Sequence, residues 1–417
     1  MGHRARSVVQ GGLIVGSGFL ILTLMYGTLY SFGVFLKPLV DDLHLAQRAL
    51  SGAYSLCFLL SGILAMPVGR LNDRIGPRVV VCSCAVLIGL GWFLSSRAGA
   101  LWQLYLYFGV LVGVGTSGGL TPVLSTIAKR FATQRGIMTG IAVAGVSTGT
   151  MLLPPLMNTL LEAYGWRTTF ALTGFGVPLL VLVLAQVLAW KPRMQAPEPL
   201  PASATGEPVA TRPATGVSVR HACRTRYLWM MFAVYVLAGF VIQIVLVHLA
   251  FHAIQGGTAA AQAAVLVSAV GFGGLSGRIV GGIASDRLGN RPTMMAAFVL
   301  MAVAFALLLL PATWGVLLAF SIIFGVAYGE VLCMMSLLPV DFFGLKNHGT
   351  IMGIITAAST IGGGLGPVVA GSLFDATGNY RIAWAVCLGF TVLAFLLVVG
   401  LRPQGLSTLK STGAGSS

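Results

Sequence analysis

The sequence predicts an all-α polytopic membrane protein with twelve transmembrane helices in two six-helix bundles. Hydrophobic residues make up 57 % of the 417-residue chain and charged residues only 8 %, whereas soluble domains carry about 25 % charged residues. The apolar residues gather in repeated runs of about 20 residues, which is the length needed to cross a bilayer. A pattern of glycines and charges in the first half also recurs in the second half at a constant spacing.

The apolar runs set the expected helices and domains. The runs of the first half cover 9–37, 47–69, 79–96, 101–128, 135–162 and 167–190, and those of the second half cover 227–252, 259–284, 293–312, 315–338, 349–374 and 381–401. We therefore expect an N-terminal bundle over 1–190 and a C-terminal bundle over 227–402. Between them, residues 191–226 are rich in Pro, Ala, Thr and Arg, which predicts a flexible cytoplasmic linker. The Ser/Gly-rich tail 403–417 is predicted to be disordered.

The basic residues indicate the orientation. The net charge is +15, but these residues are split among short segments between apolar runs, which argues against nucleic-acid binding. With the N-terminus inside, 19 of the 25 Lys and Arg residues face the cytoplasm, as the positive-inside rule requires. We expect a protein of the plasma or inner membrane with both termini cytoplasmic. The first apolar run lacks a small-residue cleavage site, so it is interpreted as a membrane helix and not a signal peptide.

The sequence does not support a disulfide-bonded protein, a nucleotide-binding protein, an enzyme or a receptor. Five of the six cysteines lie in apolar runs and Cys223 lies in a basic loop, so no disulfide is expected. The segment GFGGLSG at 271–277 lacks the preceding strand and the lysine-serine ending of a phosphate-binding loop. No metal cluster, cofactor site or nucleophile–base arrangement is apparent, so we expect neither an enzyme nor a bound metal or cofactor. The loops are too short to hold a receptor domain, and a monomer is expected.

The two halves repeat at an offset of 213 residues. The pattern Gly69-x-x-x-Asp73-Arg74-x-Gly76-x-Arg78 matches Gly282-x-x-x-Asp286-Arg287-x-Gly289-x-Arg291. The same offset carries Gly136, Gly140, Pro154 and Gly165 onto Gly349, Gly353, Pro367 and Gly378. Two repeats in parallel orientation are typical of transporters that rock one half against the other around a central site.

Longer motifs then identify a family resemblance. They are YSFGVFLKPL at 30–39, KRFATQRGIMTGIAVAG at 129–145, YGWR at 164–167, DFFGLKNHGTIMGI at 341–354 and GPVVAGSLFDATGNY at 366–380. With the repeated Gly-Asp-Arg-Gly segments, the chain resembles the major facilitator superfamily, in its monocarboxylate porter and oxalate/formate antiporter branch. The resemblance implies alternating access and proton symport of a small monocarboxylate such as L-lactate or pyruvate. The partners would be a small organic anion, a proton and the lipid bilayer; electroneutral anion exchange and other organic-anion efflux are the alternatives.

Arg278 is the leading candidate for the substrate ligand. It lies within an apolar run, where a charged side chain costs about 2.5–3.5 kcal/mol. Its repeat mate is Ala65, so the charge belongs to one half only. A guanidinium fork matches a carboxylate bidentately, and the resemblance implies that the arginine of this helix holds the substrate carboxylate. The alternative is a permanent ion pair with Glu330.

Two departures from the family pattern bear on the substrate. Animal monocarboxylate porters carry an aspartate one turn before the arginine, where this chain has Gly274, so that aspartate's proton role cannot be transferred. Oxalate-type antiporters carry a lysine near 357–359, where this chain has Ala-Ala-Ser. A single cation in the cavity favours a monovalent anion over a dicarboxylate.

The remaining site candidates each have a structural alternative. His248, one turn before His252, is either a proton carrier or a cavity-lining hydrogen-bonding residue. The resemblance implies that Lys37 takes part in proton and substrate entry on the outer side, and the alternative is a snorkelling lysine at a helix end. Glu330 is either the proton site, a partner of Arg278 or a solvated residue at the edge of the pore. The resemblance implies that Tyr328 and Cys333 line the pocket, with core packing as the alternative. Further candidates for the pocket lining are Thr28, Ser117 and Gly145.

The repeated charged segments are predicted to gate the transporter. Asp73, Arg74, Asp286 and Arg287 lie at the cytoplasmic ends of helices, where an aspartate can cap a neighbouring helix or pair with an arginine in one state only. The alternative is a simple positive-inside anchor. The recurrence of the whole pattern in both halves favours gating.

Overall fold

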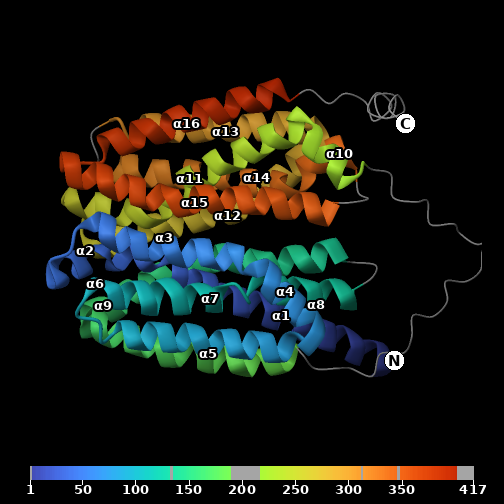
Figure 1. Ribbon diagram of the computed structural model, residues 1–417, viewed down its shortest axis with the longest axis horizontal. Helices are drawn as coiled ribbons and strands as arrows, with labels where there is room; N and C mark the ends of the chain where they lie inside the picture. Colours follow the sequence, from blue (N-terminus) through green and yellow to red (C-terminus); the bar gives the residue numbers. More distant parts are fainter. Residues whose placement is uncertain (1, 132–134, 189–216, 311–312, 345–347, 402–417) are drawn as a thin grey trace, which may run out of the picture.

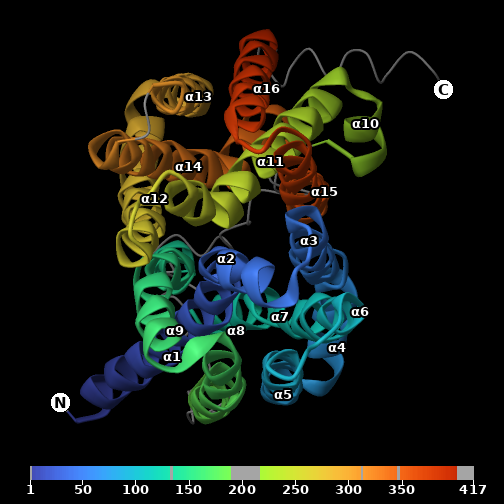
Figure 2. The ribbon, with the colours of Figure 1, turned by 90° about the vertical axis from the view of Figure 1, so that its left-hand side faces the viewer.

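The computed structural model describes residues 2–131, 135–188, 217–310, 313–344 and 348–401. Within these ranges the regular structure is helical and contains no strand. The helices form two bundles side by side, one built from each half of the chain (Figures 1 and 2). The predicted fold class is therefore confirmed.

The first half of the chain forms one bundle. Its elements are α1 (Gly2–Tyr30), α2 (Phe32–Leu43), α3 (Gln47–Ile63), α4 (Ala65–Ile75), α5 (Pro77–Ser95), α6 (Leu101–Leu104), the π-helical segment η1 (Tyr105–Val112), α7 (Gly113–Thr116), α8 (Leu120–Arg130) and α9 (Arg135–Leu188). Brief interruptions divide single membrane crossings, because Ser31 separates α1 from α2 and Leu64 separates α3 from α4. In contrast, α9 contains two crossings, which meet at Gly165.

The second half forms the other bundle. Its elements are α10 (Val219–Arg224), α11 (Arg226–Gln255), α12 (Ala260–Leu288), α13 (Asn290–Leu307), α14 (Trp314–Phe343), α15 (His348–Thr377) and α16 (Arg381–Gly400). Ten helical stretches of the described residues are long and apolar enough to cross a membrane. Dividing α9 at Gly165 adds one crossing, and α3 with α4 adds another, which makes twelve.

The sequence repeat extends to the backbone. Gly76 has φ 89° and ψ 158°, and its repeat mate Gly289 has φ 91° and ψ 161°. At the opposite end of the bundles, Gly165 and its mate Gly378 have φ 75° and 71°. Side chains with a Cβ disfavour these dihedrals, so each half needs glycine at the same two turns.

The predicted linker and tail are only partly covered. Of the linker 191–226, the described part contains the short helix α10, which the prediction of a flexible segment did not include. The Ser218 hydroxyl accepts a hydrogen bond from the His221 amide at 3.2 Å and so caps its first turn. The remainder of the linker up to 216 and the tail 403–417 lie outside the described residues.

The two bundles are in close contact at the end that carries α2, called here the α2 end, which lies opposite the N-terminus (Figure 1). Here α3 packs on α15 and α2 packs on α11, while α9 packs on α12 (Figure 2). Glycines allow the close approach: a Cβ at Gly371 would lie 2.8 Å from the Arg48 Cα, and one at Gly33 would lie 2.5 Å from the Val247 carbonyl oxygen. The α2 end is therefore closed by direct backbone contact.

Candidate functional site

Arg278 lies on α12, at the surface where the two bundles face each other. Its side chain is half-buried, and Nη1 donates a hydrogen bond of 3.3 Å to the Val143 carbonyl oxygen on α9. Among the described residues, Arg278 forms no ion pair. The alternative of a permanent Arg278–Glu330 pair is therefore not formed in this structure.

Glu330 lies on α14, close to the same region. Its side chain is 4 % exposed, and its Oε2 is buried and makes no hydrogen bond with the described residues. The close approach of α12 is possible because Gly281 has no side chain: a Cβ there would lie 3.1 Å from the Glu330 Cα and Cγ. The carboxyl oxygen Oε2 can therefore take up a proton without breaking an existing hydrogen bond.

Tyr328 packs beside Arg278 on the α14 side. It is 2 % exposed, and its hydroxyl interacts with the Arg278 guanidinium. A Cβ at Gly274 would lie 3.1 Å from two ring carbons of Tyr328. The absence of an aspartate at 274 thus has a packing reason, because the Tyr328 ring fills the space that its side chain would need.

Three polar residues that the sequence analysis missed lie in the same region. The Tyr54 hydroxyl on α3 donates a 2.9 Å hydrogen bond to Gln243 Oε1 on α11. The Tyr30 side chain on α1 also interacts with Gln243. A signal was available for Gln243, a single amide within the apolar run 236–247.

Ser147 adds an unused hydroxyl. It lies on α9, one turn after Val143, and is completely buried. Its Oγ makes no hydrogen bond with the described residues and would lie 3.7 Å from a Cβ at Gly274. The Ser147 hydroxyl, a donor without a partner among the described residues, therefore faces the side of α12 that carries Gly274 and Arg278.

Three predicted pocket residues make hydrogen bonds to backbone groups or to a side chain of the N-terminal bundle. Thr28 donates to the Leu24 carbonyl at 2.7 Å, and Ser117 donates to the Val114 carbonyl at 2.6 Å. The Gly145 carbonyl accepts a 3.0 Å hydrogen bond from Thr23 at the α1–α9 crossing. All three of these hydrogen bonds therefore lie within the N-terminal bundle. Cys333 is half-buried and lies on α14, one turn after Glu330.

His248 and Lys37 make their polar contacts at the α2 end and not with Arg278. His248 is completely buried in a hydrogen-bond network at the α2 end, with Tyr380 and Gln47 as partners. It does not line an open passage in this structure. Lys37 is partly exposed and pairs with Asp41 at 2.8 Å, one turn along α2.

The predicted gating residues lie at the end opposite α2. Arg74, Asp286 and Arg287 are exposed and form no ion pair among the described residues, and the side chain of Asp73 lies outside them.

Neighbouring residues fix the turn in the second half. The Asn290 amide donates to both Asp341 carboxyl oxygens at 3.0 and 2.9 Å. Arg291 donates to the carbonyls of Val398 and Val399 on α16, at 3.2 and 2.6 Å.

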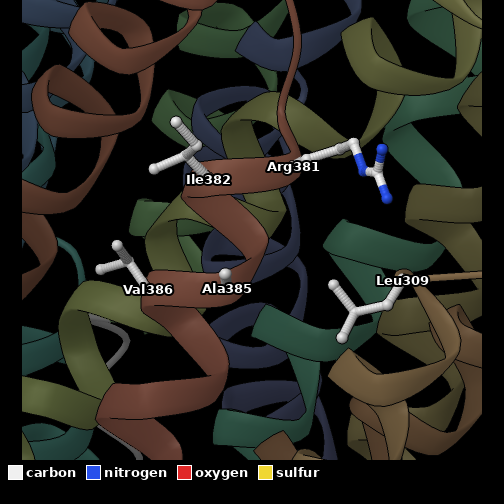
Figure 3. Close-up of a pocket in the computed structure, with 5 residues that line it drawn as sticks. All are labelled: Leu309, Arg381, Ile382, Ala385 and Val386. Carbon is white, nitrogen blue, oxygen red and sulfur yellow. The ribbon is translucent and has the colours of Figure 1, made fainter.

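A surface pocket of about 500 Å³ lies at the α2 end between α13 and α16 (Figure 3). Its lining residues are Leu309, Arg381, Ile382, Ala385 and Val386. None of the predicted site residues lines it. It is therefore separate from the Arg278 region.

Comparison with known proteins identifies the family. The sequence matches the family model of the Major Facilitator Superfamily over residues 18–283 and 255–415. It is 30 % identical to monocarboxylate transporter 3 of Rattus norvegicus over 398 residues, covering 92 % of this chain and 78 % of that protein. It is 29 % identical to monocarboxylate transporter 11 of Homo sapiens over 411 residues, covering 95 % and 83 %.

Two solved structures share the fold. A bacterial homologue of the human lysosomal transporter Spinster, in an inward-facing and unoccupied conformation, superposes with a TM-score of 0.69 at 17 % identity, covering 94 % of this chain and 95 % of that one. The nucleoside transporter NupG, solved as a point mutant, superposes with a TM-score of 0.74 at 14 % identity, covering 94 % and 99 %. The chain therefore belongs to the Major Facilitator Superfamily, in its monocarboxylate porter branch, and is a membrane transporter and not an enzyme.

Proposed function

We propose that this transporter carries small monocarboxylates such as L-lactate or pyruvate together with a proton, and that Arg278 holds the substrate carboxylate. The relatives named monocarboxylate transporters cover almost the whole chain, which supports this substrate class. The observation that carries the proposal is the state of Arg278, a guanidinium within a membrane-crossing helix that has no ion pair among the described residues.

The hydrogen-bonding capacity of Arg278 supports a carboxylate ligand. A guanidinium has five N–H donors, and the contacts with Val143 and Tyr328 leave donors for a further partner. A carboxylate can take two of them in parallel. Because one cation serves the site, a monovalent anion balances its charge, and a dicarboxylate would leave a negative charge uncompensated in a region of low dielectric.

The proton completes an electroneutral cycle, and Glu330 is the proposed carrier. Its buried Oε2 lacks a hydrogen-bond partner among the described residues, and it lies on α14 two residues after Tyr328. A proton on Glu330 would travel with the anion on Arg278. The charges of the proton and the anion cancel, so the loaded and the unloaded protein carry the same net charge.

The proposed orientation follows the positive-inside rule and puts the N-terminal end in the cytoplasm, so that the α2 end is the outer side. The closure at the α2 end then supports a conformation that is closed to the outside. Rocking of the two bundles around Arg278 would open the α2 end and close the opposite end, where Asp73, Arg74, Asp286 and Arg287 lie. The membrane is proposed to be the plasma or inner membrane.

The test is uptake of labelled L-lactate into proteoliposomes. Arg278→Ala removes two hydrogen bonds to a charged group, each worth about 1.5–3 kcal/mol, so uptake is expected to fall about 100-fold or more. Arg381→Ala, which removes an exposed arginine at the α2 end, is the matched control and should transport normally. Undiminished uptake by Arg278→Ala would refute the role of Arg278. Uptake that ignores an imposed inward proton gradient would refute symport and select anion exchange.

A further inference from the structure

Helix α3 lacks a cap of its own at the α2 end. Its N-cap residue is Ala46, which has no side-chain oxygen to accept a hydrogen bond from the first amides of the helix. The other bundle supplies the acceptor: the Asp375 carboxylate on α15 accepts the amides of Gln47 and Arg48 at 3.3 and 3.1 Å. Arg48 Nε lies 3.9 Å from the same carboxylate. A carboxylate at a helix N-terminus also interacts favourably with the helix dipole.

A buried network continues this contact toward the middle of the molecule. His248 Nε2 lies 2.9 Å from the Pro367 carbonyl oxygen and therefore donates to it, since a carbonyl can only accept. His248 Nδ1 lies 3.0 Å from the Gln47 amide nitrogen and 2.8 Å from the Tyr380 hydroxyl. Gln47 also bonds to Tyr380. The side chain and the backbone amide of one residue, Gln47, thus join α3 to α11, α15 and the residue before α16.

The internal repeat shows that this closure is one-sided. The mate of Ala46 is Ala259, which caps α12 with almost the same backbone angles, −59° and 145° against −60° and 141°. The mate of Asp375 is Glu162 on α9. Glu162 is exposed and accepts a 2.8 Å hydrogen bond from Asn158 on its own helix. Among the described residues it makes no hydrogen bond with α12, so the corresponding cap is absent on that side.

We propose that Asp375, together with the Gln47–His248–Tyr380 network, is the latch that holds the α2 end closed. Opening this end must pull α3 away from α15, which leaves the first amides of α3 without their acceptor and exposes His248. The latch stabilises the state described here relative to the state open at the α2 end. This inference rests on the alternating access of the proposed function but not on the identity of the substrate.

The latch also gives His248 a position in the transport cycle. The candidate proton carrier of the sequence analysis is sealed between the bundles while the latch is closed, with both ring nitrogens in hydrogen bonds. Opening the α2 end would free these nitrogens. Charged and titratable groups around it are Arg48 and Asp375 at the edge of the network, Tyr380 within it, and His252 one turn along α11 with its ring 5.5 Å from that of Tyr380.

The test is hydrogen–deuterium exchange of the full-length protein in lipid nanodiscs, at constant pH and without substrate. Asp375→Asn keeps the size of the side chain but removes the charge and one acceptor. The lost charge–dipole interaction and the lost acceptor together cost about 1–2 kcal/mol, which shifts a two-state equilibrium by about tenfold. We expect exchange in 44–54 and 246–252 to rise about tenfold, and exchange at the opposite end, in 284–291, to fall. Glu162→Gln is the matched control and should leave both ends unchanged.

Two outcomes would overturn the proposal. Faster exchange at Gln47 and Arg48 alone, without a change at the opposite end, would mean that Asp375 only caps a helix. An equal change of exchange in Glu162→Gln would mean that neutralising any carboxylate at the α2 end has this effect, so that Asp375 is not a specific latch. Gln47→Leu, which keeps the backbone amide and removes the side-chain network, must shift exchange in the same direction as Asp375→Asn. Because no substrate is present, failure here is distinguishable from failure of the Arg278 uptake test.

Discussion

The backbone of Gly274 lies directly against the ring of Tyr328, so that a Cβ at 274 would come within 3.1 Å of two ring carbons. Tyr328 in turn interacts with Arg278, which lies one helical turn after Gly274. The absence of a side chain at one position therefore fixes where an aromatic ring lies and, through it, the surroundings of the guanidinium.

Substitution of Gly274 tests this relationship. Gly274→Asp must displace the Tyr328 ring, and it adds a negative charge one turn from Arg278 that competes with a substrate anion. We expect the KM for L-lactate to rise by about tenfold or more, since a close opposite charge is worth more than about 1.4 kcal/mol. Gly274→Ala introduces the crowding without the charge and should raise the KM less. Equal KM values for both variants would show that charge has no part in the effect.

Tyr328→Phe separates packing from hydrogen bonding. The ring and its contact with Gly274 stay, while the hydroxyl beside Arg278 is lost. A hydrogen bond to a charged group contributes about 1.5–3 kcal/mol to stability, so its loss should lower the thermal unfolding midpoint. The KM should rise as well, because the guanidinium that is proposed to hold the substrate is then less firmly positioned. Tyr235→Phe is the control, because its buried hydroxyl has no hydrogen-bond partner among the described residues. A normal KM in Tyr328→Phe would show that the Tyr328 hydroxyl has no part in substrate binding.

Glu330→Gln tests the proton carrier. The amide has the size of the carboxyl group but cannot take up and release a proton. If Glu330 carries the coupled proton, the variant should lose accumulation of L-lactate driven by an inward proton gradient and keep exchange of labelled for unlabelled lactate. Both are measured in the same proteoliposomes. Gradient-driven accumulation at the normal rate would assign the proton to another group.

Gly289→Ala tests the repeated turn. At φ 91° and ψ 161° a Cβ is strained by about 1–3 kcal/mol, and each kcal/mol lowers the unfolding midpoint by about 2–4 °C in a domain of 150–250 residues. Gly282→Ala is the control: it lies within α12, and a Cβ there meets nothing within 4 Å. We expect a lower midpoint only for Gly289→Ala, measured by thermal unfolding in detergent. Equal midpoints would show that the turn tolerates a side chain.

The sequence was sufficient for the architecture because its signals are local or periodic. Apolar runs set the crossings, and the 213-residue offset anticipated the paired turns at Gly76 and Gly289. The Gly165 bend was expected as a break between two helices. The short helix α10 was missed because its signal is weak within a polar segment.

The candidate site was predicted less completely. Arg278 was evident as an isolated charge in an apolar run, but its contact is a backbone carbonyl, that of Val143, and any residue type can supply one. The latch joins residues 47, 248, 367, 375 and 380, and their encounter depends on how the two bundles meet. Thr28, Ser117 and Gly145 were proposed from their places on helices expected to line the cavity, and in this structure they bond locally or at a helix crossing.

The hydrogen bond from Arg278 to the Val143 carbonyl has a consequence for the empty carrier. In the proposed cycle, this peptide oxygen on the facing bundle would hold the guanidinium extended and partly hydrogen-bonded after one substrate has left and before the next binds. This hydrogen bond would offset part of the cost of keeping an unpaired cation inside the membrane. A carbonyl dipole binds a guanidinium more weakly than a carboxylate does, so the substrate anion could still replace it.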